Sequence, residues 1–333
     1  RLAGVLRDSI VELHGENHQV DPRSGKRVSL GLVRMANIDP LVGVARQLAA
    51  LGMPEAHRLH LCVYHSRFPL YLRANIEARL DRLLKRHRPG ALFEDEEMRQ
   101  CLSRYDEPNQ VFVVMASPVA EVGRDHDYDW AVVEPSSMRS VIQLAGRLRR
   151  HRLEVYEAVN LHLLSTNFKQ LEREKPAFCK PGYECGEWFL KRHDLRHVLR
   201  EEEVGRIDST PRIREQVPLD PQSYLSDLEH AVIRDMMLGD SQKCRPVTQW
   251  WETHAYLTGL LQAKQQFRAG APTESYRLLP DDDGHLHLYH VAPNGSEVSD
   301  DDLRVLLSDD YPSCGPQTVW WGETDDFTPL ERL

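Results

Sequence analysis

The sequence of 333 residues is long enough for two domains, each with a hydrophobic core of its own. Hydrophobic residues make up 41% and charged residues 28%, a balance typical of globular chains that excludes a disordered or collagen-like protein. No apolar run approaches the roughly 18 residues of a membrane-spanning helix, and the 6 scattered cysteines favour a reducing cytoplasm. Because the first residue is Arg1, we expect the sequence to be part of a longer protein.

The net charge of −9 conceals two parts of opposite sign. Residues 1–200 contain 31 Lys and Arg against 26 Asp and Glu, whereas residues 201–333 contain 11 against 25. Only the first part is therefore a candidate for binding a polyanion such as a nucleic acid.

Hydrophobic spacing predicts the elements in chain order. A helix is predicted over residues 2–14, followed by a polar loop over residues 16–27. Beyond this loop, the predicted strands are residues 28–35, 59–64, 111–116 and 130–133, and the predicted helices are residues 41–51, 70–86 and 138–150. Strands that are apolar on both faces and alternate with helices indicate an α/β fold with a parallel sheet covered on both sides. Ligands of such sheets bind at the carboxyl ends of the strands.

The composition divides the chain into four expected parts. Residues 1–27 form a leading helix and loop, residues 28–152 the α/β domain, residues 153–218 a helical linker, and residues 219–333 a small α+β domain. Within the last part we expect helices over residues 224–237 and 248–268, then a hairpin over residues 276–291.

One predicted helix carries a pattern suited to a phosphate group. Gln143, Arg147 and Arg150 are spaced to lie on one face of the helix over residues 138–150, and no acid lies within this stripe. Arginine offers a fixed fork of donors to phosphate and keeps its charge. Gly146 lacks a side chain beside Arg147, which lets another surface approach. The alternative is a solvated basic helix end.

Further candidates lie after the predicted strands. Ser117 follows the strand over residues 111–116 and can donate to a nucleic-acid phosphate. Gly123 permits a tight turn, and Asp125 can hold a ribose hydroxyl or orient an arginine. His65 and Arg67 follow another strand, where contact with a DNA backbone and a purely structural loop are both open.

These blocks resemble a known family. Residues 116–127 and 143–150 are similar to motifs V and VI of superfamily 2 helicases. The spelling from Glu121 to Asp127 resembles the CRISPR-associated type I helicase-nucleases, and residues 124–130 and 143–152 are most similar to their type I-F branch. Residues 32–39 and 64–68 resemble motif IV and the strand and loop that follow it. The resemblance is specific over residues 28–152 and loose over residues 153–333. The sequence departs from the family in having Ser117 where threonine is usual.

The resemblance implies a second RecA-like domain, a helical linker and a small C-terminal domain of an ATP-dependent helicase. It implies translocation on single-stranded DNA in the 3′-to-5′ direction, recruitment by an RNA-guided CRISPR surveillance complex, and, in the type I-F branch, a link to spacer-integration proteins. ATP and Mg²⁺ would be bound mainly by the first RecA-like domain, and divalent metals by a histidine-aspartate nuclease domain. The sequence contains neither a phosphate loop nor that nuclease, so we expect the chain alone to be inactive.

The resemblance also assigns roles to the candidate residues. Arg147 and Arg150 would contact the γ-phosphate. The residues expected to bind or position the nucleotide are Gln143, Gly123, Asp125 and Gly146, and those expected to contact DNA are Ser117, His65 and Arg67. No resident metal is expected in this chain.

Two other functions remain open from the sequence: another superfamily 2 translocase with a different tail, and a non-catalytic docking module with a helicase-like fold.

Two weaker residue patterns each allow two interpretations. The pairs Trp250-Trp251 and Trp320-Trp321 could stack on bases or lie in a core. The arginines of the helix over residues 70–86 could form a basic track or a solvated face.

Overall fold

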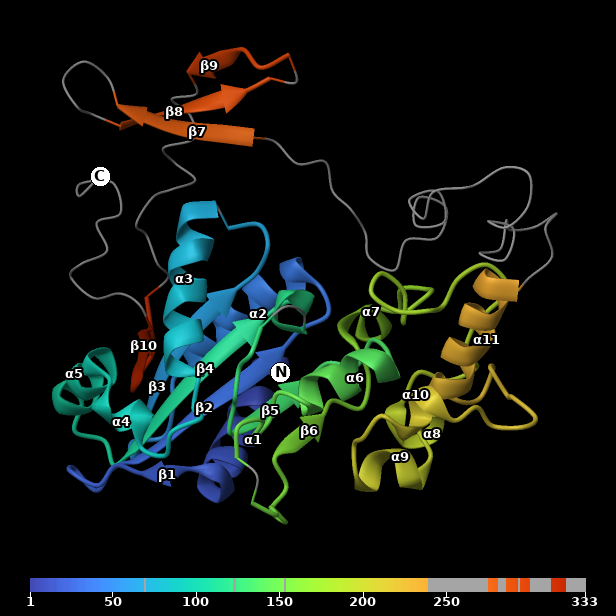
Figure 1. Ribbon diagram of the computed structural model, residues 1–333, viewed down its shortest axis with the longest axis horizontal. Coiled ribbons are helices and arrows are strands. Elements are labelled where there is room, and N and C mark those ends of the chain that lie inside the picture. Colours follow the sequence, from blue (N-terminus) through green and yellow to red (C-terminus); the bar gives the residue numbers. More distant parts are fainter. Residues whose placement is uncertain are drawn as a thin grey trace.

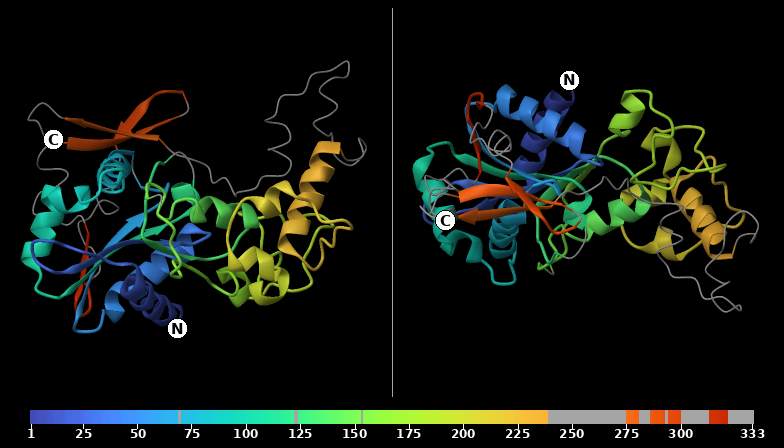
Figure 2. Two further views of the ribbon diagram at one scale, coloured as in Figure 1. Left: turned by 60° about the horizontal axis from the view of Figure 1, so that its bottom comes forward. Right: turned by 90° about the horizontal axis from the view of Figure 1, so that it is seen from above.

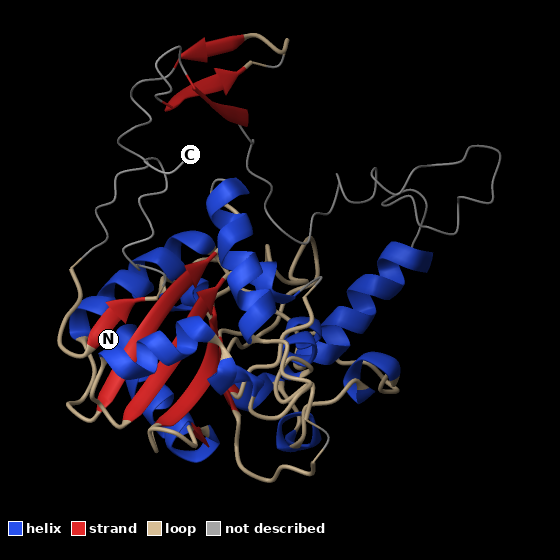
Figure 3. Cartoon of the chain, turned by 60° about the vertical axis from the view of Figure 1, so that its left-hand side comes forward, coloured by secondary structure: helices blue, strands red, loops and turns tan. Residues whose placement is uncertain are grey.

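The computed structural model describes residues 1–68, 70–121, 124–152, 154–238, 275–280, 286–292, 294–299 and 313–321. Within them lies a mixed α/β fold, in which helices cover both faces of a mostly parallel seven-stranded sheet (Figures 1 and 3). This confirms the predicted fold class. No helix in the described ranges is long and apolar enough to span a membrane.

The strands of the main sheet follow the order β10-β3-β4-β2-β5-β6, with β1 antiparallel to β2 and the other pairs parallel. Their bounds are β1 Gln19–Val20, β2 Arg27–Arg34, β3 His57–Tyr64, β4 Asn109–Ala116, β5 Trp130–Val133, β6 Leu161–Leu163 and β10 Thr318–Trp320. A separate antiparallel sheet consists of β7 Ser275–Pro280, β8 Leu286–Val291 and β9 Glu297–Ser299. The helices are α1 Leu2–Asn17, α2 Ile38–Leu51, α3 Leu70–Leu83, α4 Ala91–Glu94, α5 Glu96–Arg104, η1 Pro118–Glu121 (a 3₁₀ helix), α6 Met138–Ala145, α7 Phe168–Leu171, α8 Leu195–Val198, α9 Glu201–Gly205, α10 Thr210–Ile213 and α11 Leu225–Leu238.

The centre of the main sheet is buried on both faces because β2, β4 and β5 are largely apolar. The alternation is clearest in β4, whose residues point to two clusters in turn: Val111, Val113 and Met115 to the cluster under α1 and α2, and Phe112, Val114 and Ala116 to the cluster under α3 to α6. Gly31 in β2 makes room for Trp130, since a Cβ there would lie 2.2 Å from the indole ring. The Trp130 ring can therefore fill the centre of the core only because Gly31 in the neighbouring strand has no side chain.

Several predicted elements are confirmed within one to three residues at their ends: the strands β2 to β5 and the helices α1, α2, α3 and α11. The predicted hairpin is present as β7 and β8, although its turn lies outside the described residues, as does the predicted helix over residues 248–268. The loop predicted over residues 16–27 contains β1, which extends the sheet edge at the start of β2.

The helix predicted over residues 138–150 is wrong in its second half. It ends at Ala145, so Arg147 and Arg150 do not share a helical face with Gln143. Gly146 closes the last turn, and the backbone then pairs with the segment before β5: Tyr128 N–H donates to Arg147 O (2.9 Å) and Arg149 N–H to Tyr128 O (2.9 Å). These bonds replace helical ones, and the left-handed Arg149 (φ 49°) completes the turn.

The strand β10 was not predicted, and it forms one edge of the main sheet. It runs parallel to β3, with Val319 opposite His60. The backbone just before β10 passes close to the end of α2. A Cβ on Gly315 would lie 2.2 Å from Ala50 O. Trp320 packs toward the cluster of α1 and α2, whereas Trp321 is buried in the other cluster against Phe112. Trp321 therefore lies in the core and Trp320 is partly buried, while Trp250-Trp251 falls outside the described residues.

The segments that follow β6 pack beside α6 and share its core (Figures 1 and 2). Phe178, Val198 and Leu228 belong to the same apolar cluster as Val141 and Leu144 of α6. Residues on either side of position 218 thus contribute to one core. The division of the chain at residues 152 and 218 stays a prediction.

Candidate nucleotide and nucleic-acid site

The parallel strands bring some of the candidate residues to the carboxyl ends of the strands. Since β3 and β4 run in the same direction, the loops that follow them meet there, with His65 and Arg67 after β3 and Ser117 after β4. The loop after β4 then returns toward the start of β5, where Asp125 and the turn after α6 with Arg147 lie beside the segment before that strand. Gly123 lies outside the described residues.

Arg147 is buried with a side chain that is only partly satisfied. The residue is 8% exposed, its Nη2 donates to the main-chain oxygen of Glu121 (2.9 Å), and its Nε is buried without a hydrogen-bond partner. Burial, followed by the charge of Arg150, lowers the pKa of Arg147. An incompletely solvated guanidinium of this kind is stabilised when an anion reaches it.

The carbonyl that holds Arg147 is itself fixed by a buried ion pair. The Glu121 carboxylate accepts from Arg34 Nε at 2.8 Å and from Ser140 Oγ at 3.1 Å. Arg34 ends β2 and also donates to Ser136 Oγ at 2.7 Å. The loop after β4 is therefore tied both to the centre of the sheet and to the first turn of α6.

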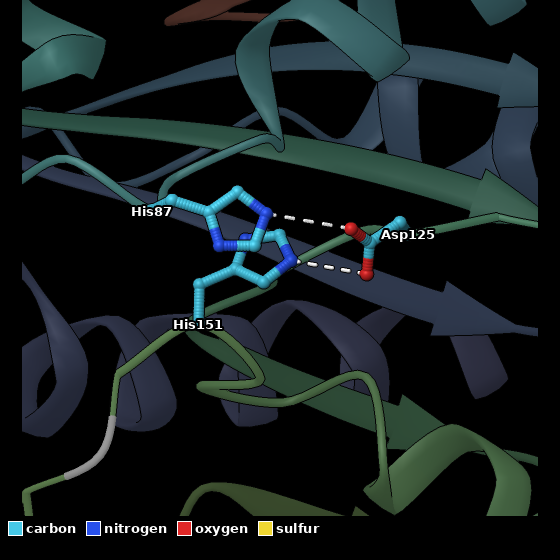
Figure 4. Close-up of side chains that lie close together, drawn as sticks. All are labelled: His87, Asp125 and His151. Atoms are coloured by element: carbon cyan, nitrogen blue, oxygen red, sulfur yellow. Dashed lines mark ion pairs between the residues drawn. The ribbon is translucent and has the colours of Figure 1, made fainter.

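A second cluster surrounds Asp125 (Figure 4). Arg150 Nε donates to its Oδ1 at 2.7 Å, and the two side chains are each 47% exposed. His151 Nε2 lies 3.1 Å from the same oxygen, and His87 Nε2 lies 3.4 Å from Oδ2. The His151 and Arg150 side chains hold the pKa of Asp125 well below its usual range. Arg150 is thus held at the surface by a carboxylate that is always ionised near neutral pH.

The same three residues, His87, Asp125 and His151, lie close enough together to suggest a metal site. One hydrogen bond argues against His151 as a ligand. Arg86 N–H donates to His151 Nδ1 (3.0 Å), so that nitrogen carries a lone pair and the proton of the neutral ring is on Nε2, facing Asp125. A protonated Nε2 has no lone pair for a metal, so the three side chains fit a cluster of charge contacts around Asp125 better than a metal site.

The remaining nucleotide candidates lie near this turn. Gln143 is partly buried in α6, one turn before Arg147. Gly146 is exposed, and a Cβ there would meet only Ile142 O and Gln143 O at ordinary distances of 3.5 and 3.6 Å. The inside of the fold therefore does not require a glycine at this position.

The residues expected to contact DNA differ in how available they are. Ser117 is buried, and its main-chain N–H donates to Tyr64 O at 3.1 Å. His65 stacks on Phe68 with ring centroids 4.1 Å apart, and burial lowers its pKa to about 4, so the ring is neutral at neutral pH. Arg67 is exposed and pairs with Asp39. Of these three side chains, Arg67 alone presents a positive charge at the surface.

The arginines of α3 and the loop after it carry their own counter-charges. The pairs are Arg73–Glu77, Arg79–Glu97, Arg82–Asp95, Arg86–Asp129 and Arg88–Glu94. This arrangement favours paired charges over a basic track, and one of the pairs, Arg86–Asp129, is buried.

Sequence reasoning missed Arg34, Glu121, His87 and His151. The only local signal is that Arg34 closes an otherwise apolar strand, which marks a charge that must find a buried partner. The partner comes from 87 residues further along the chain, so spacing could not have found it.

Comparisons with known proteins show which proteins the chain resembles. Residues 27–153 match a family model described as CRISPR-associated nuclease/helicase Cas3, C-terminal. The chain is 47% identical over 326 residues (96% of its length) to the CRISPR-associated nuclease/helicase Cas3 subtype I-F/YPEST of Pseudomonas aeruginosa, and 44% identical over 311 residues (90%) to that of Pectobacterium atrosepticum. The chain belongs to the Cas3 family. It spans 30% and 28% of the length of these two relatives.

Solved Cas3 structures are also similar to this chain. The crystal structure of T. fusca Cas3 aligns with a TM-score of 0.33 at 20% identity. The match covers 50% of this chain and 16% of the T. fusca chain. A crystal structure described as that of a CRISPR-associated protein aligns with a TM-score of 0.39 at 16% identity. The match covers 88% of this chain and 31% of the other chain. The Cas3 assignment rests on the family model and the curated relatives. The segment that matches the Cas3 model begins with β2 and ends just after Arg150, so it contains every candidate site residue.

Proposed function

We propose that this chain is the second RecA-like domain, with attached C-terminal segments, of an ATP-dependent translocase on single-stranded DNA in a CRISPR interference helicase-nuclease. The observation that carries the proposal is Arg147, a buried arginine in the turn after α6, held by the loop that follows β4 and with an unpartnered Nε. A phosphate oxygen at this nitrogen would satisfy it.

In this proposal, ATP and Mg²⁺ are held mainly by the first RecA-like domain of the same protein, and Arg147 and Arg150 complete the site. ATP supplies the phosphoryl group whose transfer to water drives movement along DNA. Arg147 neutralises charge on the terminal phosphate from a position fixed by Glu121 O. Arg150 joins it by exchanging Asp125 for a phosphate oxygen, and Gln143 and Gly146 line the same turn. Gly123 would shape the loop beside Asp125.

The DNA backbone would pass over the loops after β3 and β4. Ser117 and the neutral His65 would supply hydrogen-bonding groups, and Arg67 would exchange Asp39 for a phosphate. We assign residues 28–152 to the motor domain, residues 153–218 to a linker and residues 219–333 to an accessory domain. The nuclease domain with its divalent metals, the surveillance complex and the spacer-integration proteins would act with other parts of the full-length protein.

The test is single-stranded-DNA-stimulated ATP hydrolysis by the full-length protein. Arg147→Ala should lower kcat by about 10³-fold, the size expected for an arginine that stabilises phosphoryl transfer, while DNA affinity stays within about two-fold. Arg196→Ala is the control for the loss of an arginine elsewhere, because Arg196 is exposed and pairs with Asp194 outside the segment that matches the Cas3 model. Turnover near that of the wild type in Arg147→Ala would overturn the role.

Two further measurements address the alternatives. The chain alone should not hydrolyse ATP, and metal-dependent hydrolysis by it would contradict the proposed division of the ATP site. Affinity for labelled single-stranded DNA should fall steeply with salt if the loops contact phosphates. A chain that binds no DNA at low salt would favour the docking module.

A further inference from the structure

Glu229 is a buried carboxylate that the proposed mechanism does not use. It lies in α11, outside the segment that matches the Cas3 model, and is 0% exposed. Its Oε1 accepts from Met138 N–H, and its Oε2 accepts from Arg139 N–H (3.3 Å) and from Nη1 of Arg212 in α10 (3.1 Å). A side chain from the C-terminal segments therefore binds the start of the helix that leads to Arg147.

This contact completes the N-terminal cap of α6. The first N–H groups of a helix lack partners within it, and a negative charge there is favoured by the helix dipole. Ser137 Oγ accepts from Ser140 N–H at 3.0 Å, and Glu229 takes the N–H groups of Met138 and Arg139. The position of α6 along its own axis is thus set by a carboxylate that belongs to α11.

A displacement at the start of α6 would reach its far end. The helix has 8 residues, a length of about 12 Å, and packs along α11 through one apolar cluster. Arg147 N–H donates to Leu144 O at 2.8 Å, and Arg147 O accepts from Tyr128 N–H at 2.9 Å. A short helix bonded at both ends moves as a unit.

We propose that Glu229, supported by Arg212, is a positioning residue for Arg147. The helical segments α10 and α11 would then be part of the nucleotide site rather than an independent attachment. This inference rests on the proposed role of Arg147.

The test compares two buried carboxylates of α11 in the full-length protein. Glu229→Gln keeps one acceptor oxygen and the side-chain volume but removes the charge. Asp227→Asn is the matched control: Asp227 is buried on the same helix, pairs with Arg200 at 2.7 Å and accepts from Asp220 N–H at 2.9 Å, and neither partner belongs to α6. We expect Glu229→Gln to lower kcat for DNA-stimulated ATP hydrolysis at least 10-fold with the KM for ATP within about two-fold. Asp227→Asn should keep the wild-type kcat.

The outcomes separate this inference from the proposed function. Normal turnover in Arg147→Ala overturns the proposed function and this inference with it. A defective Arg147→Ala beside a normal Glu229→Gln, or equal losses in Glu229→Gln and Asp227→Asn, overturns the positioning role alone. If Glu229→Gln does not fold, Arg212→Met carries the test, since Arg212 is partly exposed. It should lower kcat about 3-fold with KM unchanged, and an unchanged kcat would overturn the inference.

Discussion

The buried Glu229 carboxylate should leave a signature in how stability depends on pH. Burial raises its pKa from an ordinary value of 4.5 to about 7, against the opposing effects of Arg212 and the two main-chain N–H groups. The folded state therefore holds this proton more tightly than the unfolded state. The resulting contribution to the free energy of unfolding is fully present below about pH 4.5 and is lost as the pH rises through about 7.

The magnitude follows from the two pKa values. A difference of this size corresponds to about 3 kcal/mol, a large share of the 5–15 kcal/mol that stabilises a typical domain. Glu229→Gln removes the titration. The difference in free energy of unfolding, wild type minus Glu229→Gln, should thus fall by about 3 kcal/mol between pH 4.5 and 7.5. Above pH 7.5 this difference should change little.

The assay is urea denaturation of the chain at several pH values, with Asp227→Asn as the control for a second buried carboxylate. Because the comparison is a difference between two proteins, other titrating groups cancel to first order. A difference that stays constant with pH, or that grows in favour of the wild type as the pH rises, would refute the reasoning. A constant difference would mean that Arg212 and the helix N-terminus balance burial, and a growing one that they outweigh it.

Three further predictions follow from the described contacts. Trp321→Ala should lower the free energy of unfolding by about 3–5 kcal/mol, measured in urea, because the ring is buried against Phe112; a loss below about 1 kcal/mol would contradict the packing of β10. Gly31→Ala should destabilise by about 1–3 kcal/mol or more and change the tryptophan fluorescence, since its Cβ would overlap Trp130, and an unchanged spectrum and stability would contradict that overlap. Asp125→Asn should change stability by less than about 1 kcal/mol because the pair with Arg150 is half exposed, and a larger loss in thermal denaturation would show that the cluster is structural.

The fold was largely predictable because its central strands are apolar on both faces. The runs in β2, β4 and β5 signal burial directly, and the helices between them require a parallel sheet. The strand β10 could not be predicted because its three residues show too little periodicity. Its partner β3 also lies more than 250 positions earlier in the sequence. Local patterns do not record such a pairing.

The candidate site was predictable in its composition but not in its geometry. The motif residues after β4 do meet the turn that carries Arg147, because Glu121 O accepts from Arg147 Nη2. The helical stripe failed because helix periodicity was extended through Gly146, whereas main-chain bonds to Tyr128 draw the chain out of the helix. The supports of the site, Arg34 and Glu229, are single charges whose partners are distant in sequence. Their roles emerge only after folding.

The position of β10 ties the completion of the fold to the last part of the chain. Until residues 313–321 leave the ribosome, the edge of β3 has unpaired main-chain groups, and the pocket that Trp321 fills is open. Synthesis of some 250 residues separates the two partners, so nascent chains must protect this edge by other means, with a chaperone or a transient contact. Expression fragments that stop short of residue 313 would keep that exposed edge permanently and should aggregate.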